Sequence, residues 1–421
     1  MKILLISEYF PPKIFGGGEI SSWLLAKNLS NQGIDVSILT SHFNEPKKYE
    51  EHEGVKIYRN LLTGKNPNSV IENFKRAVVF PFTTEKELIK LDKKENFDLI
   101  HCMNINSIIG AAKAKEKVRK PMIAHINSPQ LFCPLGTLVR ENKLCNETCS
   151  FLKFFKCFLR SGKISKVEKK FYLQYNPFFV FYVYHRFKKR KKSLREMDFF
   201  IAVSNFMKNL LLREGIPEER IAVVPNMVEL GKFSKLKVEQ HDPARILYIG
   251  NYEKFKGPQI LLEALREIKM DYRANFYGAG SLEKWMKNFV KENNLQEKIK
   301  ICGEVTYEKI PQIYEENDIV VFPSLIGEAF GRVALEAMAS GKIVIASKIG
   351  GVVDIIENGK DGFLIEPGDV NGLIYSIKTI IQNRKFREVL CEEAREKAKD
   401  YSEEKIAREL VKIYESVKNV R

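Results

Sequence analysis

Two glutamates, Glu328 and Glu336, form the pair in this chain best suited to binding a polar ligand. Glu328 lies in a loop expected after a strand, and Glu336 lies on the helix that Phe330 and Gly331 introduce. Carboxylates accept hydrogen bonds from hydroxyl groups, and the free N–H groups at the start of a helix bind anions. The junction therefore suits a ligand with sugar hydroxyls and a phosphate. On this chemistry alone, two solvated surface glutamates are the alternative.

Three further features place phosphate-binding or reactive groups at expected strand ends. Lys256 follows the first strand of the second half of the chain and offers a cation to a phosphate. Gly17 and Gly18 follow an N-terminal strand, and glycines let backbone N–H groups approach a phosphate closely. His125 directly follows the strand-like run MIA. The structural alternatives are a flexible turn for the glycines and a hydrogen-bonded core position for the histidine.

The chain alternates short apolar runs with helical patterns in two rounds. The runs are KILLIS (2–7), DVSILT (35–40), FDLIHC (97–102), MIAHI (122–126), FFIAVS (199–204) and IAVVPN (221–226), then RILYIGN (245–251), NFYGAG (275–280), KIKICG (298–303), DIVVFPS (318–324) and KIVIAS (342–347). This alternation predicts parallel sheets covered by helices on both faces. We therefore expect an α/β protein with two tandem Rossmann-like, doubly wound domains that face each other across a cleft.

The expected domain boundaries follow from the same alternation. The N-terminal domain spans 1–228 and carries an insertion at about 130–195. A polar linker over 229–243 leads to a C-terminal domain over 244–396. A C-terminal helix over 397–421 is expected to pack back on the N-terminal domain.

The charge of the chain is concentrated in one segment. The 421 residues carry a net charge of +16, but 14 Lys and Arg and a single acid, Glu168, lie between 151 and 195. This segment also contains 13 Phe and Tyr. Basic residues interleaved with aromatic rings favour an anionic membrane surface. The alternatives are a helical excursion with a solvated basic face and a nucleic-acid site, and clustered Phe side chains fit nucleic acid less well.

Neither a signal sequence nor a membrane span is expected. The N-terminal apolar run MKILLIS is too short for a secretory signal. No aromatic or apolar stretch reaches the roughly 20 residues that a membrane-spanning helix needs. We therefore expect a cytoplasmic protein that is peripheral on the inner face of the membrane.

Four cysteines form a separate feature. Cys133, Cys145, Cys149 and Cys157 lie at separations of 12, 4 and 8 residues. A tetrahedral zinc site could use four thiolates, but the paired C-x2-C motifs typical of such sites are missing. Buried free thiols are therefore favoured over a structural zinc site or a disulfide.

Taken in order, these motifs resemble those of the retaining nucleotide-sugar glycosyltransferases of family 4, a group 1 family with the GT-B fold. The E-x7-E motif formed by Glu328 and Glu336 carries the resemblance, which runs through nearly the whole chain. The other matching segments are GGGE (16–19), His125, Ser204 in AVSNF, PNMV (225–228), Lys256 with Gly257, FYGAG (276–280), FPS (322–324), the stretch 350–369 and YSEEKIAREL (401–410).

The resemblance implies a role for each matched residue. Glu336 is expected to hold the ribose hydroxyls of the donor, and Glu328 a hydroxyl of the donor sugar. The expected catalytic residues are His125, in a supporting rather than nucleophilic role, Lys256 at the diphosphate, and Glu328. The expected donor-binding residues are Gly17, Gly18, Asn251, Lys256, Gly278, Phe330, Gly331, Arg332 and Glu336.

The implied reaction moves a hexosyl group, with retention of configuration, from a UDP- or GDP-linked donor to a saccharide or lipid-linked acceptor. Lysine and helix termini take the place of a divalent ion at the diphosphate, so neither a cofactor nor a catalytic metal is expected. The basic segment is assigned to an anionic membrane surface, and a nucleic-acid partner is not expected.

One position departs from the family pattern. Asn251 stands where the family usually has an arginine, and a neutral amide cannot replace a bidentate guanidinium at a diphosphate. Either Lys254, Arg332 or another cation compensates, or the protein is a catalytically weak or inactive nucleotide-sugar-binding protein.

Overall fold

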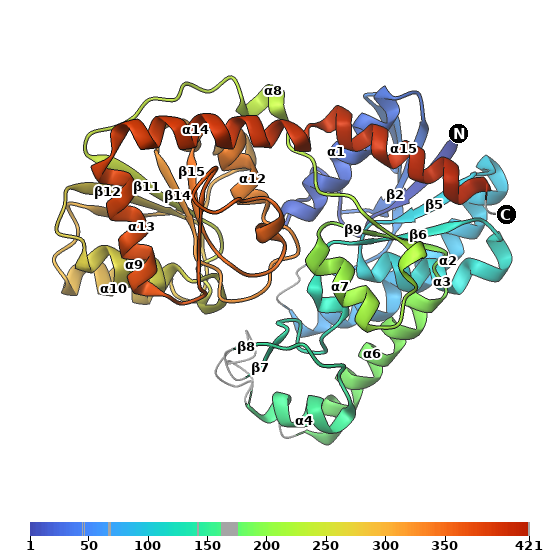
Figure 1. Ribbon diagram of the computed structural model, residues 1–421. Helices are drawn as coiled ribbons and strands as arrows, with labels where there is room; N and C mark the ends of the chain where they lie inside the picture. Colours follow the sequence, from blue (N-terminus) through green and yellow to red (C-terminus); the bar gives the residue numbers. More distant parts are fainter. Residues whose placement is uncertain (44, 46, 66–68, 141–142, 161–175, 420–421) are drawn as a thin grey trace. The chain divides into compact units, whose positions relative to one another are not determined.

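A computed structural model describes residues 1–43, 45, 47–65, 69–140, 143–160 and 176–419 of the chain (Figure 1). The chain divides into two compact units, each built on its own sheet. Unit 1 comprises Met1–Met227 and Glu403–Arg421, and unit 2 comprises Val228–Ser402.

Unit 1 is built on an eight-stranded sheet in the order β10-β9-β6-β5-β1-β2-β4-β3. Its strands are β1 (Lys2–Ile6), β2 (Asp35–Ser41), β3 (Tyr49–His52), β4 (Val55–Leu61), β5 (Leu99–Cys102), β6 (Met122–Ile126), β9 (Phe199–Ala202) and β10 (Ile221–Val223). All neighbouring strands in this sheet are parallel except the pair β3 and β4. The central strands are almost fully buried, as expected when helices cover both faces of a sheet.

One strand at the edge of this parallel sheet, β3, was not expected from the sequence and is antiparallel. Strand β3 pairs antiparallel with β4 across a tight turn formed by Glu53 and Gly54, whose φ values are 48° and 74°. A two-residue turn of this hand joins neighbouring strands directly and leaves no room for the crossover helix that parallel pairing needs.

Helices cover both faces of the unit 1 sheet. The helices of unit 1 are α1 (Gly17–Asn31), α2 (Val70–Glu95), α3 (Ile105–Val118), α6 (Pro177–Arg195), α7 (Asn205–Arg213) and α15 (Glu403–Asn419), together with α4 (Phe151–Arg160), which lies away from the sheet. Helix α1 packs on α15, and both α2 and α6 pack on α3 (Figure 1). Helix α15 begins later than the expected 397, because helix α14 (Arg384–Ala398) continues to Ala398 and Ser402 is extended.

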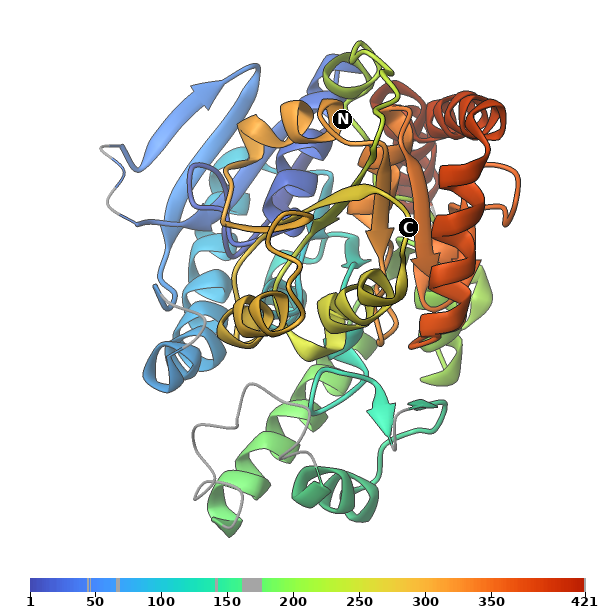
Figure 2. The same ribbon diagram turned by 90° about the vertical axis from the view of Figure 1, so that its left-hand side faces the viewer.

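The segment expected as an insertion is partly integral to unit 1. Its described parts are a short turn η1 (Pro129–Leu131), the hairpin β7 (Val139–Arg140) and β8 (Lys143–Leu144), and helices α4 and α6. The hairpin and α4 lie away from the sheet of unit 1 in both views (Figures 1 and 2). The later part of α6, in contrast, buries Phe187 and Leu194. Residues 161–175, which carry part of the expected basic and aromatic segment, lie outside the described residues. No described helix is long and apolar enough to cross a membrane.

Unit 2 is built on a six-stranded sheet of parallel strands in the order β13-β12-β11-β14-β15-β16. The strands are β11 (Ala244–Ile249), β12 (Tyr272–Tyr277), β13 (Ile299–Gly303), β14 (Ile319–Phe322), β15 (Ile343–Ser347) and β16 (Phe363–Ile365). The helices are α8 (Leu230–Phe233), η5 (Lys254–Lys256), α9 (Pro258–Glu267), α10 (Glu283–Glu292), η6 (Tyr307–Lys309), α11 (Ile310–Glu315), α12 (Arg332–Ala339), η7 (Gly351–Asp354), α13 (Val370–Gln382) and α14.

The segment 229–243 belongs to unit 2 and is not a separate linker. Helix α8 lies within it, and Phe233 is fully buried with its ring centroid 5.9 Å from that of Tyr314. This aromatic contact anchors an otherwise polar run whose lack of period had suggested a linker. The two helix-covered sheets confirm the expected pair of α/β, doubly wound domains.

Candidate functional site

The carboxyl ends of β11 and β14 bring Lys256 and Glu328 together. Lys256 ends the short helix η5 that follows β11, and Glu328 lies in the loop after β14. Their side chains form an ion pair, and Ser324 Oγ donates a hydrogen bond to Glu328 Oε1 at 3.1 Å. The residues expected to meet the diphosphate and the donor sugar therefore contact each other.

Close packing at this edge depends on two glycines. Gly257 has a φ of +76°, and a Cβ there would lie 1.9 Å from the carbonyl oxygen of Pro323. Only glycine lets η5 pass so close to the end of β14, which places Lys256 beside Glu328. Gly278, expected to bind the donor, has a φ of +144°, and its Cβ would lie 1.9 Å from the Gly250 oxygen. The packing of the protein alone therefore requires glycine at both positions.

A second cluster surrounds Glu336 on α12. Glu336 is 6% exposed, and its Oε1 accepts hydrogen bonds from Arg332 at 2.8 Å and from the Tyr307 hydroxyl at 3.3 Å. The ammonium group of Lys232 lies 3.8 Å from the centroid of the Tyr307 ring. Burial and the nearby Glu336 carboxylate raise the pKa of Tyr307, so its hydroxyl keeps its proton at neutral pH. The cluster holds the Glu336 carboxylate in one orientation.

Phe330 and Gly331 lie directly before α12. Gly331 has a φ of +111° and caps the helix, and the Phe330 ring packs against that of Tyr401 with centroids 6.0 Å apart. The preceding loop is fixed at Glu328, whose carbonyl accepts a hydrogen bond from Gly351 N–H at 2.8 Å. The N–H groups in the first turn of a helix have no partner within the helix, and groups of this kind can bind an anion.

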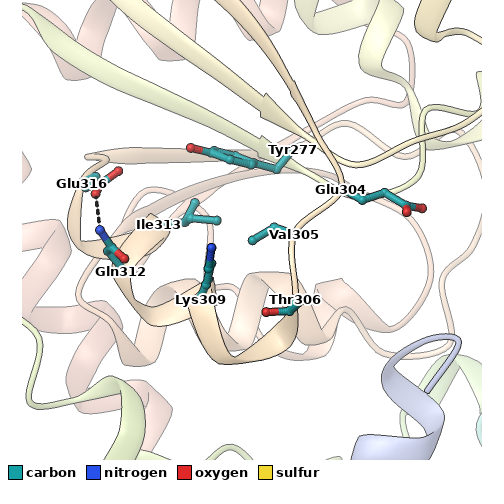
Figure 3. Close-up of a pocket in the computed structure, with 8 residues that line it drawn as sticks. All are labelled: Tyr277, Glu304, Val305, Thr306, Lys309, Gln312, Ile313 and Glu316. Atoms are coloured by element: carbon teal, nitrogen blue, oxygen red, sulfur yellow. Dashed lines mark hydrogen bonds between the residues drawn. The ribbon is translucent and has the colours of Figure 1, made fainter. Parts of the chain in front are cut away.

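A pocket of about 350 Å³ lies near the carboxyl ends of β12 and β13 (Figure 3). Its lining residues are Tyr277, Glu304, Val305, Thr306, Lys309, Gln312, Ile313 and Glu316. Gln312 Nε2 donates a hydrogen bond to Glu316 at 2.9 Å (Figure 3). Thr306 directly precedes Tyr307, so the pocket lies next to the residue that contacts Glu336.

His125 lies in unit 1, as the penultimate residue of β6. It is 7% exposed, its Nδ1 lies 3.2 Å from His101 Nε2, and its Nε2 has no hydrogen-bond partner among the described residues. Burial lowers the pKa of His125 to about 4. The imidazole is therefore neutral at pH 7.

Gly17 and Gly18 form the first turn of α1. The Glu19 carboxylate accepts a hydrogen bond from Gly16 N–H at 2.9 Å, which caps this end of the helix. Apart from its chain neighbours and the backbone of α1, no atom of the described residues would lie within 4 Å of a Cβ at Gly18. Packing within the protein therefore does not explain glycine at position 18, whereas a closely approaching ligand would.

Asn251 follows the end of β11, and its side chain is exposed. Its backbone oxygen accepts a hydrogen bond from the Tyr248 hydroxyl at 2.9 Å. Of the two cations considered as substitutes for the usual arginine, Arg332 is paired with Glu336. Lys254 is exposed on η5, and no ion pair joins it to any carboxylate of the described chain. Lys254 is therefore the better placed of the two.

The four cysteines of the separate sequence feature, Cys133, Cys145, Cys149 and Cys157, are free thiols in unit 1. Burial and the nearby thiols of Cys133, Cys157 and Cys145 raise the pKa of Cys149 to about 12. Within the part of the chain that the structure describes, no group of three or more His, Cys, Asp and Glu side chains is placed to hold a metal ion.

Comparison with known proteins connects this geometry to a family. The family model described as Glycosyltransferase Family 4 matches residues 15–232, and the model described as Glycosyl transferases group 1 matches residues 232–397. An uncharacterized glycosyltransferase of Methanocaldococcus jannaschii is 32% identical over 419 residues, which cover 99% of both chains. The chain belongs to the family 4, group 1 glycosyltransferases.

Solved structures of other proteins have the same fold as this glycosyltransferase. A sucrose-phosphate synthase from Thermosynechococcus elongatus is similar with a TM-score of 0.76, at 21% identity and with 100% of each chain covered. Anabaena HepE in complex with UDP-glucose is similar with a TM-score of 0.68, at 19% identity over 99% of this chain and 100% of that one. Both likenesses confirm the expected GT-B fold.

The sequence did not reveal two polar clusters of this glycosyltransferase. Tyr307 stands in no recognisable motif, so only its contact with Glu336 reveals it. In unit 1, the buried carboxylate of Glu8 accepts hydrogen bonds from Arg76 at 2.8 and 3.2 Å and from Asn106 at 2.7 Å. An acidic residue directly after a buried strand was the one sequence signal that could have indicated Glu8.

Proposed function

We propose that this glycosyltransferase moves a hexosyl group, with retention of configuration, from a UDP- or GDP-linked donor to a saccharide or lipid-linked acceptor. The observation that carries the proposal is the ion pair of Lys256 with Glu328. A second, buried ion pair joins Arg332 to Glu336, and both of these residues follow Glu328 closely in the sequence. Both pairs lie beyond the carboxyl end of β14, where doubly wound sheets bind their ligands.

Each part of the donor is assigned to groups with matching chemistry. We assign the ribose to Glu336 and the base to the neighbouring pocket of about 350 Å³. The similarity to HepE, whose structure contains UDP-glucose, supports a nucleotide-sugar of this kind. We assign the diphosphate to Lys256 and the start of α12, with Gly17 and Gly18 in the same role from unit 1.

Lys256 and Glu328 are proposed to change partners when the donor binds. The diphosphate competes for the Lys256 ammonium, which leaves the Glu328 carboxylate to accept a hydrogen bond from a sugar hydroxyl. Negative charge on the diphosphate grows as the glycosidic bond breaks, and Lys256 and the helix N–H groups stabilise that charge. Because these groups supply the positive charge, the proposal includes no metal ion or other cofactor.

We propose that retention arises on one face of the sugar. The bond from the anomeric carbon to the diphosphate oxygen breaks, and a bond to the acceptor oxygen forms. The acceptor hydroxyl gives its proton to the leaving diphosphate. Retaining hydrolases use two carboxylates, one as nucleophile, whereas Glu328 is paired with a lysine and is not assigned that role. Neutral His125 is assigned to a hydrogen bond with the donor sugar.

Nucleotide-sugar turnover tests this proposal directly. Purified protein is incubated with a panel of UDP-, GDP- and ADP-sugars, and both hydrolysis and transfer are measured. We expect binding and turnover of a UDP- or GDP-sugar. If no member of the panel binds or turns over, the proposed function is wrong.

The acceptor is proposed to lie at the inner face of an anionic membrane. Helices α4 and α6 expose apolar side chains, with Leu152 71%, Phe178 85% and Phe181 63% exposed. The basic run from Lys188 to Lys192 follows on α6, and each Lys or Arg near an anionic bilayer contributes about 1 kcal/mol. Anionic liposomes should bind the protein at low salt, and the double variant K188Q/K192Q should bind them more weakly. Unchanged binding of this variant would remove the membrane part of the proposal.

A second candidate is a protein that binds the donor but turns it over weakly or not at all. The exposed amide of Asn251, at the position of the usual arginine, favours it. The variant Asn251→Arg separates the candidates. Turnover that arises only in the variant supports the second candidate, and an already active parent protein excludes it.

A further inference from the structure

Unit 1 contains three arginines, Arg76, Arg186 and Arg190, that the proposed donor site does not use. We call them the arginine cluster. Arg186 and Arg190 lie four residues apart on α6, so they share one face of that helix. Arg76 lies on α2, which meets α6 where the rings of Phe74 and Tyr182 stack with centroids 6.4 Å apart.

The arginine cluster carries more positive charge than its neighbours neutralise. Arg76 is paired with Glu8 at 2.8 Å, and Glu19 also lies near it. Arg186 lies 5.6 Å from the centroid of the Tyr182 ring, and Arg190 Nη1 donates a hydrogen bond to the Gln130 carbonyl oxygen at 3.3 Å.

Across the described residues, neither Arg186 nor Arg190 forms an ion pair with a carboxylate. Burial and the neighbouring guanidinium groups of Arg186 and Arg76 lower the pKa of Arg190 to about 10. These charges repel one another in a partly buried place. An anionic ligand would stabilise the arrangement.

The elements around the arginine cluster place it at the ligand-binding edge of the unit 1 sheet. Glu8 follows β1, and Gln130 lies in η1, which follows β6. His125 belongs to the same strand β6. The arginine cluster is therefore next to the edge where doubly wound sheets bind ligands.

The other end of α6 offers an apolar surface. Phe178 and Phe181, near its start, are 85% and 63% exposed, and Leu152 of the adjacent α4 is 71% exposed. One helix thus joins an exposed apolar surface to two arginines that form no ion pair with any carboxylate of the described part of the chain. Guanidinium groups bind phosphate oxygens in a bidentate manner. A ligand with a phosphate head and a hydrocarbon tail matches both ends of α6.

We propose that Arg186 and Arg190 bind the phosphate or diphosphate of a lipid-linked acceptor, whose hydrocarbon chain follows the exposed apolar side chains of α6 and α4. Arg76, held by Glu8, adds positive charge beside them. The inference rests on the proposed function and narrows its acceptor from a saccharide in general to one carried on a lipid phosphate.

Equilibrium binding to the full-length protein tests the inference with farnesyl diphosphate as the probe. Farnesol lacks the phosphates, and inorganic pyrophosphate lacks the tail. We expect farnesyl diphosphate to bind at least about tenfold more tightly than either. The double variant R186Q/R190Q should lose about tenfold in affinity for farnesyl diphosphate. R186K/R190K keeps the charge but not the bidentate geometry, so it should lose part of that affinity.

The matched control is K90Q/K93Q, which removes two exposed charges from α2. It should leave the affinity for farnesyl diphosphate unchanged. An equal loss in the control and in R186Q/R190Q would show general charge attraction and overturn the inference. Equal affinities of the parent protein for farnesol and farnesyl diphosphate would also overturn it.

Two more measurements distinguish a lipid-phosphate site from a contact with bilayer headgroups and from a loss of folding. If R186Q/R190Q weakens binding to phosphatidylcholine vesicles that contain phosphatidylglycerol but not to farnesyl diphosphate, the arginines bind bilayer headgroups and the inference is wrong. Binding of the UDP- or GDP-sugar that the donor panel identifies should be the same in all variants, which also shows that they fold. A parent protein that binds this donor sugar but not farnesyl diphosphate contradicts this inference and leaves the proposed function standing.

Discussion

A buried chain of hydrogen bonds connects His125 to the last helix of the protein. His101 lies between His125, at 3.2 Å, and the hydroxyl of Tyr414, at 2.7 Å. Burial raises the pKa of Tyr414, so its hydroxyl is protonated and needs an acceptor. If it donates to His101 Nδ1, His101 carries its proton on Nε2 and donates to His125 Nδ1. His125 then carries its own proton on Nε2 and can donate a hydrogen bond to a sugar hydroxyl.

The two buried histidines make folding stability depend on pH. Burial lowers the pKa of His125 to about 4 and also lowers that of His101, whereas histidine in an unfolded chain titrates near 6.5. Protons therefore bind preferentially to the unfolded chain in this range. The contribution of His125 is complete above about pH 6.5 and should be lost as the pH falls towards about 4.

Urea unfolding at several pH values between 7.5 and 5 measures this effect. As the pH is lowered over this range, the free energy of unfolding should fall less in the variant His125→Gln than in the parent protein. His52→Gln is the matched control, because the His52 side chain is 63% exposed. If the free energy of unfolding changes with pH to the same extent in the parent protein and in His125→Gln, His125 does not titrate differently in the folded and unfolded states.

Lys256 should matter more for turnover than the other cations near it. In Lys256→Ala the diphosphate loses the positive charge proposed to stabilise it as the bond breaks, so kcat should fall about 100-fold. Lys254→Ala should mainly raise the KM for the donor if Lys254 compensates for Asn251. The exposed Lys269, elsewhere in unit 2, provides the control variant Lys269→Ala. A Lys256→Ala variant as active as this control would remove Lys256 from the mechanism.

At the scale of elements, a substitution at the start of α1 should affect stability and donor binding in opposite directions. A Cβ at Gly18 would meet no atom of the described residues outside α1 within 4 Å, and alanine favours a helix over glycine by up to about 1 kcal/mol. Gly18→Ala should therefore stabilise the protein or leave its stability unchanged, yet weaken donor binding by blocking the approach of the diphosphate. Thermal unfolding and the KM for the donor measure the two effects.

Gly257→Ala is the matched contrast to Gly18→Ala. Its Cβ would lie 1.9 Å from the Pro323 oxygen, so this variant should lower stability as well as activity. If Gly18→Ala keeps full donor affinity, the first turn of α1 does not contact the diphosphate.

The strands that the sequence predicted are those in which a run of apolar side chains indicates burial. Strands such as β6, MIAHI, are continuous apolar runs, so their positions followed from the residues alone. Strand β3, YEEH, is mostly exposed at the sheet edge, and its polar residues give no strand pattern. Strand β16 has three residues, too few to show any period.

The candidate site was predictable only where it coincided with a motif. Glu328, Glu336 and Lys256 stand in recognisable segments, and the structure places Glu328 and Lys256 in contact. Tyr307 and Arg76 do not, because their partners, Glu336 and Glu8, are far away in the sequence. Contacts of this kind depend on how strands and helices assemble, which a local pattern does not contain.

At the scale of the whole molecule, the chain leaves unit 1 after Met227 and returns to it at Glu403. The returning helix α15 packs on α1 and is amphipathic, with one side buried in unit 1. Its buried residues are Ile406, Ala407, Leu410, Tyr414 and Val417. The last residues of the chain therefore complete the unit that contains His125, and not the unit that precedes them in the sequence.

Removing residues 403–421 should accordingly destabilise unit 1 while unit 2 keeps its stability. Each large apolar side chain removed from a core costs about 2–5 kcal/mol, so the loss of Ile406 and Leu410 alone lowers the stability of unit 1 substantially. Differential scanning calorimetry with and without UDP distinguishes the units, because a ligand that binds unit 2 raises the unfolding temperature of that unit. In the truncated protein, the unfolding transition that UDP does not shift should disappear or move to a lower temperature. Leu410→Ala should reproduce part of this effect, whereas Lys412→Ala, at an exposed position of the same helix, should not. If the truncation instead lowers the temperature of the transition that UDP shifts, α15 stabilises unit 2.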